Sequence, residues 1–359
     1  MQILIYGARS LALGACEALR LLYPTYHIRG FLVTSMTGNR TGLAGLPVWE
    51  IKDFTENVCV TGREDYHVLV ATPEDLHADI VDTLIAYGYT QYTCLNSVKE
   101  SKLMERYFKQ QGRFPSIHGL ELGGEGAELC VYMAQFCKDR SLKNPVTLPL
   151  WSHPLQVGAA LTKMRIAADT DDTGVNISAK NVNYCELTAL YWMWKNKLEP
   201  IRGNAEYYGL YHYRRVLDVA EEDLYRLKAN DVDAVLPFPT LHEPDALEHH
   251  DRYIPESDWN AMLKALAELH PSYAQALPGI FAWPYLYNYN LILARRQVLA
   301  DYCAWLFPIL ERTEALSDPK GWQRADRYIG YLGENLMTLY FMFHQKDLNI
   351  YHTGRLMLT

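Results

Sequence analysis

The sequence predicts an α/β protein made of two units. Short apolar runs alternate with amphipathic segments of helical spacing, which is the pattern of parallel strands joined by crossover helices. The chain has 359 residues, more than a single hydrophobic core usually accommodates. A glycine-rich stretch at 113–126 interrupts the alternation. We therefore expect a Rossmann-like domain with a parallel sheet at 1–112, a linker at 113–126 and a larger α/β domain at 127–359.

Charge and composition exclude several classes of protein. The net charge is −8, and proteins that coat nucleic acid need clustered Lys and Arg, so we expect no nucleic-acid partner. No apolar run reaches the roughly 18 residues that span a bilayer, and the N-terminal residues lack a signal-peptide pattern. Seven scattered cysteines without a CxxC pair are typical of reduced thiols. Together these features predict a cytoplasmic protein.

The first unit alternates between strands and helices along its whole length. Its apolar runs are short, and the segments between them repeat their apolar residues at helical spacing. The expected strands are residues 2–6, 28–34 and 67–71, and the expected helices are residues 11–22, 75–87 and 102–111.

The first strand-to-helix turn bears on whether this unit binds a cofactor. Of the glycines in the dinucleotide fingerprint G-x-G-x-x-G only Gly7 is present, and Arg9 stands where the backbone would have to approach a pyrophosphate. Arg9 and Ser10 at a helix N-terminus are still candidates for holding a phosphate. We favour the alternative, a structural or partner-docking module that holds no cofactor.

A polar loop followed by a buried helix stands out in the second unit. Asp171, Asp172, Asn176 and Asn181 supply oxygen atoms and amides that suit ribose, sugar hydroxyls or a divalent cation. The helix expected at 186–195 is apolar nearly all round, which predicts that it is buried.

Glu186, at the start of this helix, has two interpretations. Asn183 precedes it by three residues, which resembles a capping box with Asn183 as the N-cap. Alternatively, Glu186 is a general base beside the polar loop. The spacing leaves both interpretations open.

Two arginines end a strand expected at 207–217. Side chains alternate along a strand, so His212 and Arg214 would share one face and Arg215 would lie on the other. Arginines in such a place favour an anionic ligand, because Arg binds phosphate groups in a bidentate manner. An ion pair with a neighbouring acid is the alternative.

The remaining elements continue the alternation. The other expected strands are residues 129–136, 231–239 and 285–294, and the other expected helices are residues 220–229, 258–270, 296–314 and 325–344. The polar segment 137–145 follows the first of these strands, at the edge of the sheet where α/β folds place ligands.

Further side chains in this part are candidates for a site. Asn288 and Asn290 alternate on an expected strand, so they would lie on one face. Arg327 and Glu334 are seven residues apart and would share a helix face. His250 belongs to a histidine-rich segment without the spacing of a HExxH metal site, which we expect to be a mobile loop on the acceptor side.

Several ordered motifs in residues 127–345 are shared with a known family: LQVGAAL, DDTGVNIS, KNVNYCELTALYWMWKN, YYGLYHYRR and RYIGYLGENLMTLY. This part resembles bacterial capsular and exopolysaccharide biosynthesis proteins whose C-terminal region was catalogued as a domain of unknown function and is now grouped with glycosyltransferases. The resemblance implies a GT-A-like domain. It also implies transfer of a hexose, galactofuranose in some members and with inversion, from a nucleotide sugar to a surface glycan such as capsule, exopolysaccharide or O-antigen. A UDP-sugar is the first expectation for the nucleotide sugar.

The resemblance gives the candidate side chains roles in this transfer. His212 and Arg214 would stabilise the leaving nucleotide. The residues expected to bind the nucleotide sugar are Asp171, Asp172, Asn176, Asn181, Arg215 and Arg327, and those expected to bind the acceptor are Asn288, Asn290 and His250. Glu186, Asp258 and Glu334 compete as the general base, and the sequence does not choose among them.

Two alternatives belong to other classes of protein. One is a non-catalytic module that binds a nucleotide sugar or glycan and docks onto membrane-associated polysaccharide assembly machinery, which would place the protein at the inner face of the membrane. The weaker one is an NAD-dependent sugar oxidoreductase or epimerase. Metal dependence, with a divalent cation as an option, and oligomeric state are left open by these patterns.

Overall fold

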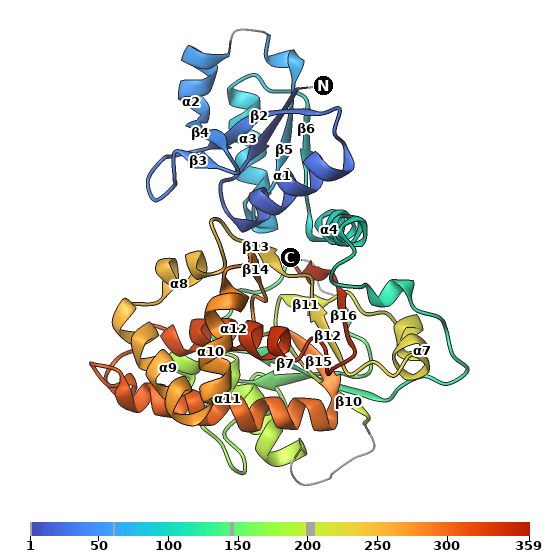
Figure 1. Cartoon of the computed structure of the whole chain (residues 1–359), viewed down its shortest axis with the longest axis vertical. Helices are drawn as coiled ribbons and strands as arrows, with labels where there is room; N and C mark the ends of the chain where they lie inside the picture. The colour runs from blue at the N-terminus through green and yellow to red at the C-terminus, as the bar shows by residue number, and fades with distance from the viewer. Residues whose placement is uncertain (1, 60–61, 144–146, 199–204) are drawn as a thin grey trace.

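The structure is a computed structural model that describes residues 2–59, 62–143, 147–198 and 205–359, apart from the side chain of Trp322. It is an α/β protein with two main sheets, a smaller one built from the N-terminal part of the chain and a larger one from the remainder (Figure 1). The expected fold class is confirmed. None of the described helices is both long and apolar enough to cross a bilayer.

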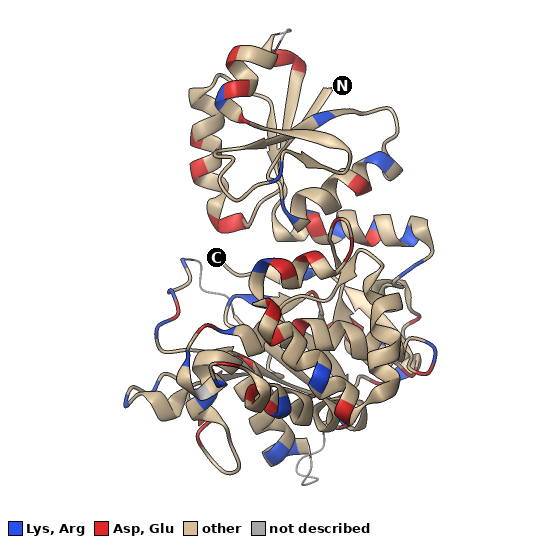
Figure 2. Cartoon of the chain, turned by 60° about the vertical axis from the view of Figure 1, so that its left-hand side comes forward, with Lys and Arg blue, Asp and Glu red and all other residues tan. Residues whose placement is uncertain are grey.

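The smaller sheet has six strands in the order β3-β4-β2-β1-β5-β6, all parallel except the β3–β4 pair. The strands are β1 (Gln2–Tyr6), β2 (His27–Val33), β3 (Gly42–Leu43), β4 (Leu46–Glu50), β5 (Tyr66–Val70) and β6 (Tyr92–Cys94). The helices are α1 (Ser10–Leu22), α2 (Ile51–Asp53), α3 (His77–Ala86) and α4 (Ser97–Gln111). The strands and helices expected in this part are confirmed, with ends shifted by a few residues. Acidic and basic residues alternate along α4, which begins before its expected start (Figure 2).

The larger sheet runs in the order β16-β12-β15-β10-β7-β8-β9 and is mixed, because β15 pairs antiparallel with both β10 and β12. Its strands are β7 (Leu129–Gln135), β8 (Ser152–Gln156), β9 (Asp169–Thr170), β10 (Tyr207–His212), β11 (Arg215–Leu217), β12 (Ala234–Pro237), β15 (Ile292–Arg295), β16 (Ile350–Thr353) and β17 (Arg355–Met357). A separate pair is formed by β13 (Thr240–Leu241) and β14 (Tyr285–Leu286). The four neighbours β10, β7, β8 and β9 are parallel, so their carboxyl ends meet at one edge.

Helices cover this sheet, and two of them form much of the core. The helices are α5 (Asn181–Tyr184), α6 (Leu187–Met193), α7 (Glu221–Ala229), α8 (Leu247–Tyr253), α9 (Glu256–Leu269), α10 (Pro271–Phe281), α11 (Arg296–Leu316) and α12 (Tyr328–Phe343). Nearly every side chain of α6 and α12 is buried. Burial of each large apolar side chain contributes about 1.5–3 kcal/mol, so these helices hold the rim of the sheet rigidly.

Two expected strands are broken by turns. The strand expected at 207–217 is a hairpin, in which β10 ends at His212 and β11 begins at Arg215, with these two residues paired. His212 and Arg214 therefore do not alternate on one strand face. The strand expected at 285–294 is interrupted between β14 and β15, where Tyr289 and Asn290 adopt positive φ angles of 71° and 50°.

Two further local expectations were wrong. Asn183 does not cap α6. It belongs to the short helix α5, and its side-chain amide donates to the carbonyls of Gly321 and Arg324. The segment around His250 is not an open loop but the helix α8, and His250 is buried against Trp259 with ring centroids 4.2 Å apart.

The two sheets are joined by direct contacts as well as by α4. The backbone N–H of Ala44 donates to the carboxylate of Glu243 at 2.7 Å, and Arg214 pairs with Asp75 at 3.1 Å. The segments that follow β5 and β6 share a small cavity with Arg215 and Arg355. The carboxyl edge of the smaller sheet, where a Rossmann domain would hold a dinucleotide, is thus turned toward the larger domain.

A buried histidine on β16 predicts acid sensitivity. The Tyr287 hydroxyl lies 2.8 Å from Nε2 of His352, and burial lowers the pKa of this imidazole from 6.5 to about 3. Between those values the unfolded chain binds a proton that the folded chain excludes, so stability is complete above pH 6.5 and falls as the pH falls. The expected loss is up to about 1.4 kcal/mol per pH unit.

Urea unfolding at about pH 7.5 and pH 5 measures this loss. His212 and His242 also have a pKa lowered by burial and add to the wild-type slope. The His352→Gln variant, which does not titrate, isolates the share of His352 and should show a shallower decline. An equal decline in both proteins would contradict the assignment.

A candidate active-site cleft at the carboxyl edge of the larger sheet

A cleft opens at the carboxyl ends of β7, β8 and β10. It consists of two adjoining cavities of about 320 and 330 Å³. The side chains that line both cavities are Asp139, Cys185, Glu186, His212, Tyr213 and Arg327. Because these residues come from the segments after β7, between α5 and α6, after β10 and before α12, the parallel sheet edge is what brings them together.

Glu186 and His212 lie close together in this cleft. The Glu186 carboxylate accepts a hydrogen bond of 2.7 Å from the Asn290 side chain, and its Oε1 lies 3.7 Å from Nε2 of His212. Burial lowers the pKa of His212 against the opposing effect of Glu186, so the imidazole is neutral near pH 7. That Nε2 atom is buried and has no hydrogen-bond partner among the described residues.

Two arginines of the cleft lack an anionic partner. Among the described residues, no carboxylate lies within ion-pair distance of Arg215 or Arg327. Arg215 lies over the Tyr289 ring at 4.4 Å, and Arg327 donates through Nε to the sulfur of Cys185 at 3.3 Å. Arg214 also lines the cleft but is paired with Asp75. Arg215 is half-buried and Arg327 is exposed, and two guanidinium groups that line one cleft without a carboxylate favour an anionic ligand.

The N-terminus of α12 approaches the cleft closely because two of its residues lack a side chain. A Cβ on Gly330 would lie 3.2 Å from the sulfur of Cys185, and a Cβ on Gly333 would lie 2.7 Å from Leu187. Arg327 precedes the helix with φ 67°. The first backbone N–H groups of α12 and their dipole therefore add positive potential to the side of the cleft that holds Arg327.

Glu334 lines the cleft, but both of its oxygens are engaged. Oε1 accepts the backbone N–H of Tyr289 at 2.8 Å, and Oε2 lies 2.9 Å from Nε2 of His249. Glu334 thus anchors the turn that carries Tyr289 and Asn290. Asn288 is buried in the same turn, and Oδ1 of Asn288 has no partner among the described residues.

Asp139 is a residue of the cleft that our sequence analysis did not single out. Its carboxylate accepts the backbone N–H of Phe136 at 2.7 Å, and burial raises its pKa although His212, Arg214 and Arg327 act in the opposite direction. The polar segment after the strand expected at 129–136 pointed to this place. Nothing in that segment distinguished Asp139 from the charged residues around it.

The acidic loop lies outside the cleft, and its polar groups bind one another. Asp171 is fully buried and accepts the backbone N–H groups of Gly158 and Ala159. Asp172 pairs with Arg165 at 2.9 Å, and the Asn176 amide donates to backbone carbonyls of the loop. Of the four polar candidates in this region, Asn181 alone lines the described cleft, where its amide donates to the Cys185 carbonyl and the Thr188 hydroxyl.

Asp258 and His250 are also away from the cleft. Asp258 is fully buried in a bidentate ion pair with Arg324, which itself lies over the Tyr328 ring at 3.9 Å. His250 packs on Trp259 and lies 3.2 Å from Asp251. Neither side chain lines the two cavities of the cleft.

The burial of Asp258 gives a prediction about stability. Replacement of Asp258 by alanine leaves Arg324 with only the exposed carboxylate of Asp326 at 2.9 Å as its partner, so the free energy of unfolding should fall by up to about 3 kcal/mol. Urea unfolding measures this loss, and ligand binding at the cleft should persist in the folded fraction. A variant of unchanged stability that has lost all activity would instead place Asp258 in the chemistry.

The turn after β1 offers little space for a phosphate or a cofactor. Arg9 donates to the carbonyl of Gly38, and the cavity that Arg9 and Ser10 line measures about 20 Å³. Glu243, Glu248, Arg40 and Arg252 line it too, so charged side chains of both signs already occupy this small space. Gly7, with φ 123°, serves the turn itself, because a Cβ would lie 2.6 Å from the Ala71 carbonyl oxygen. These residues do not fit a dinucleotide. Within the described part of the chain, no cluster of three or more His, Cys, Asp or Glu side chains could hold a metal ion.

Comparison with known families decides the relationship of this chain. A family model described as a domain of unknown function, DUF4422, matches residues 143–346, more than half of the chain. The chain belongs to the DUF4422 family. The DUF4422 region contains Glu186, His212, Arg215 and Arg327, whereas Asp139 lies just before it.

Solved structures add a likeness to an enzyme. The apo structure of WbbM, a bifunctional glycosyltransferase, matches with a TM-score of 0.54 and 26% sequence identity, over 65% of this chain and 45% of WbbM. The chain therefore spans less than half the length of that protein. RSP, a Rex-family repressor, matches with a TM-score of 0.22 and 13% identity over 31% of this chain and 60% of its own, which is too weak to support an argument. No curated protein matches the chain.

Proposed function

We propose that this DUF4422 protein is a glycosyltransferase that moves a hexose, such as galactofuranose, from a UDP-sugar to a glycan acceptor in surface polysaccharide synthesis. The observation that carries the proposal is the pair Arg215 and Arg327, which face the cleft without a carboxylate partner among the described residues. A diphosphate satisfies two such guanidinium groups. The likeness to WbbM supports the same class of reaction.

The cleft also holds what the acceptor side of the reaction needs. In an inverting transfer the acceptor hydroxyl attacks the anomeric carbon of the donor sugar. The bond from that carbon to the diphosphate oxygen breaks with its electron pair, and the acceptor proton passes to a base. Glu186, held by Asn290 and flanked by neutral His212, is the carboxylate best placed for this role. Arg215, Arg327 and the α12 N-terminus would stabilise the departing diphosphate.

The remaining candidates take lesser roles in this proposal. Asn181 would contact the sugar donor from the α5 side, and Asn290 would orient Glu186. Arg214 is paired with Asp75 of the smaller domain, so a ligand bound beside Arg214 would affect this contact between the domains. A divalent cation bound with the diphosphate is compatible with the proposal but is not required by it. The enzyme would act beside the membrane-associated machinery that assembles the polysaccharide.

A panel of UDP-, GDP- and dTDP-hexoses tests the proposal, with and without manganese or magnesium. We expect at least one UDP-hexose to raise the melting temperature and to be turned over when an acceptor oligosaccharide is added. Absence of binding across the panel would reject the proposal. Tight binding without acceptor-dependent turnover would favour a non-catalytic nucleotide-sugar module instead.

A further inference from the structure

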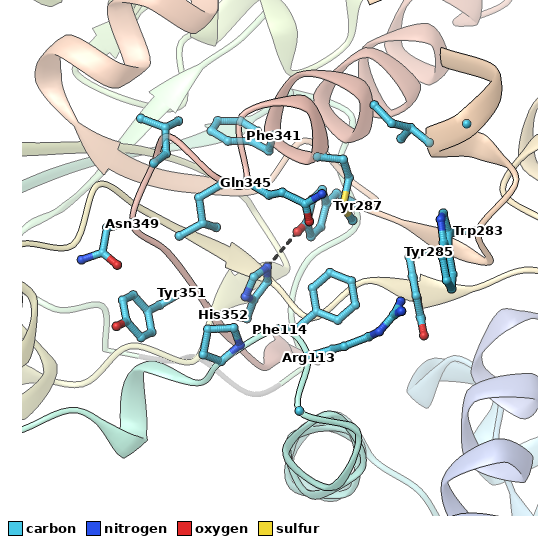
Figure 3. Close-up of a pocket in the computed structure, with 17 residues that line it drawn as sticks. Arg113, Phe114, Trp283, Tyr285, Tyr287, Phe341, Gln345, Asn349, Tyr351 and His352 are labelled. Atoms are coloured by element: carbon cyan, nitrogen blue, oxygen red, sulfur yellow. Dashed lines mark hydrogen bonds between the residues drawn. The ribbon is translucent and has the colours of Figure 1, made fainter. Parts of the chain in front are cut away.

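A cavity larger than either part of the cleft lies away from it. It measures about 710 Å³, within the range of about 300–1,000 Å³ that is typical of ligand sites. Its walls are the segment after α4, the ends of α10 and α12, β14 and β16 (Figure 3). The cavity therefore lies where the chain passes from the smaller domain into the larger one.

Aromatic rings form much of the wall. Trp283 and Tyr285 lie nearly parallel, with ring centroids 6.5 Å apart and an interplanar angle of 9°, and the Arg113 guanidinium lies 4.3 Å from the Trp283 centroid. In Figure 3 these three side chains gather at one end of the cavity, and Tyr351 and Asn349 lie at the other. Trp283 is 51% exposed. An indole left this open at the mouth of a cavity offers a flat apolar face to a ligand.

The polar side chains of the wall are mostly neutral. Gln345 is exposed, and its amide has no hydrogen-bond partner among the described residues. His352 is held neutral by burial and is bonded to Tyr287. Arg113 is the one charged side chain among the described residues that line the cavity. A diphosphate would find several cations in the cleft but a single one here, so the two sites differ in the ligand chemistry they favour.

Flat aromatic faces combined with amides, hydroxyls and a single guanidinium match a neutral sugar. The apolar C–H face of a pyranose or furanose ring stacks on an aromatic ring, and its hydroxyls exchange hydrogen bonds with amide and hydroxyl groups. We propose that this cavity binds a neutral oligosaccharide, with Trp283 as the stacking platform and Gln345 and Arg113 as hydrogen-bonding groups.

The chain between the two sites suggests what the oligosaccharide is. Tyr285 and Tyr287 line the cavity, whereas Tyr289, two residues further on, lines the cleft. A glycan held in the cavity would contact the segment that also positions the Glu186 partner Asn290. This last step rests on the proposed function. If the protein extends a glycan, the ligand of the cavity is an internal stretch of that glycan.

Saturation-transfer NMR and calorimetry with the full chain, without any nucleotide sugar, test the cavity. The probes are neutral oligosaccharides of galactose, glucose, mannose and rhamnose. We expect at least one to bind, Trp283→Ala to weaken its binding about tenfold or more, and Trp283→Phe to retain part of it. Gln345→Ala gives a second, exposed substitution that should weaken binding without affecting the fold. Arg327→Ala, in the cleft, should leave oligosaccharide binding unchanged.

The outcomes separate this inference from the proposed function. If the wild type binds an oligosaccharide, Trp283→Ala loses that binding and the wild type turns over no nucleotide sugar, the cavity assignment is supported and the transferase is rejected. Normal turnover with no oligosaccharide bound in the panel would overturn the cavity assignment and leave the transferase in place. Binding that Trp283→Ala and Gln345→Ala leave unchanged, or binding of polyprenyl phosphate in micelles in place of the sugars, would also overturn it.

Discussion

Replacement of Arg327 by alanine should weaken binding of a UDP-hexose about a hundredfold and reduce turnover at least as much. Arg327 faces both cavities of the cleft, and its Nε donates to the Cys185 sulfur while its terminal nitrogens have no described carboxylate partner. Arg327 is exposed without a ligand, but a bound nucleotide sugar would cover it, and truncation of one partner of a covered charge-assisted bond costs about 2–5 kcal/mol. Calorimetry with UDP and with the sugar nucleotide identified by the panel measures the loss.

A matched arginine on the surface provides the control. Arg312 pairs with Glu268 at 2.7 Å, and its side chain is 44% exposed. The Arg312→Ala variant should bind the nucleotide sugar as the wild type does. Arg327→Lys keeps a charge but not the planar fork, so we expect an intermediate affinity. If Arg327→Ala folds normally and binds the nucleotide sugar with wild-type affinity, the diphosphate does not lie against Arg327.

The parts of the fold that local periodicity controls could be predicted from the sequence. In the first sheet, β1, β2 and β5 are short apolar runs and α1, α3 and α4 repeat their apolar residues at helical spacing, so their bounds shifted by only a few residues. The short elements β3, β4, β6 and α2 were not predicted. No local sequence pattern indicated the hairpin after His212. Its turn, Tyr213 and Arg214, contains none of the residues that usually indicate a turn, and pairing of β11 with β17 at the far end of the chain stabilises it.

The turn at Tyr289 and Asn290 shows the opposite situation. Asparagine tolerates positive φ, so the sequence allowed a turn there, but the apolar alternation on both sides favoured a continuous strand. The turn is stabilised by Glu334 of α12, which lies 45 residues further along the chain and accepts a hydrogen bond from the Tyr289 N–H. A bond over this separation leaves no pattern in the local sequence.

The site itself was predictable in kind but not in arrangement. His212, Arg215, Arg327 and Glu186 were singled out by residue type and local position, and the sheet edge brings them to one cleft. The acidic loop had equally suitable residues. In the structure, however, the Asp171 carboxylate accepts hydrogen bonds from the backbone N–H groups of Gly158 and Ala159 and does not face the cleft. Whether a carboxylate faces a ligand or its own backbone depends on tertiary contacts that composition does not encode.

Glu186→Gln should reduce kcat by about 10²–10⁴-fold and leave affinity for the nucleotide sugar nearly unchanged. The amide is close in shape to the carboxylate and can still accept the Asn290 hydrogen bond, so the fold should persist. What it lacks is the capacity to take the acceptor proton. Single-turnover kinetics with saturating donor and acceptor measures the chemical step, and calorimetry measures donor binding separately.

The three carboxylates that compete for this role differ in the pattern of effects their variants should show. Asp258→Ala should lose stability and keep the chemical step, because Asp258 neutralises Arg324 in the core. Glu334→Gln should loosen the turn at Tyr289, since it disturbs the contact with His249, and should lower stability and kcat together. Glu186→Gln alone should reduce kcat at wild-type stability. If it retains full kcat while Glu334→Gln loses activity without loss of stability, the base is Glu334 and the role of Glu186 is to hold Asn290.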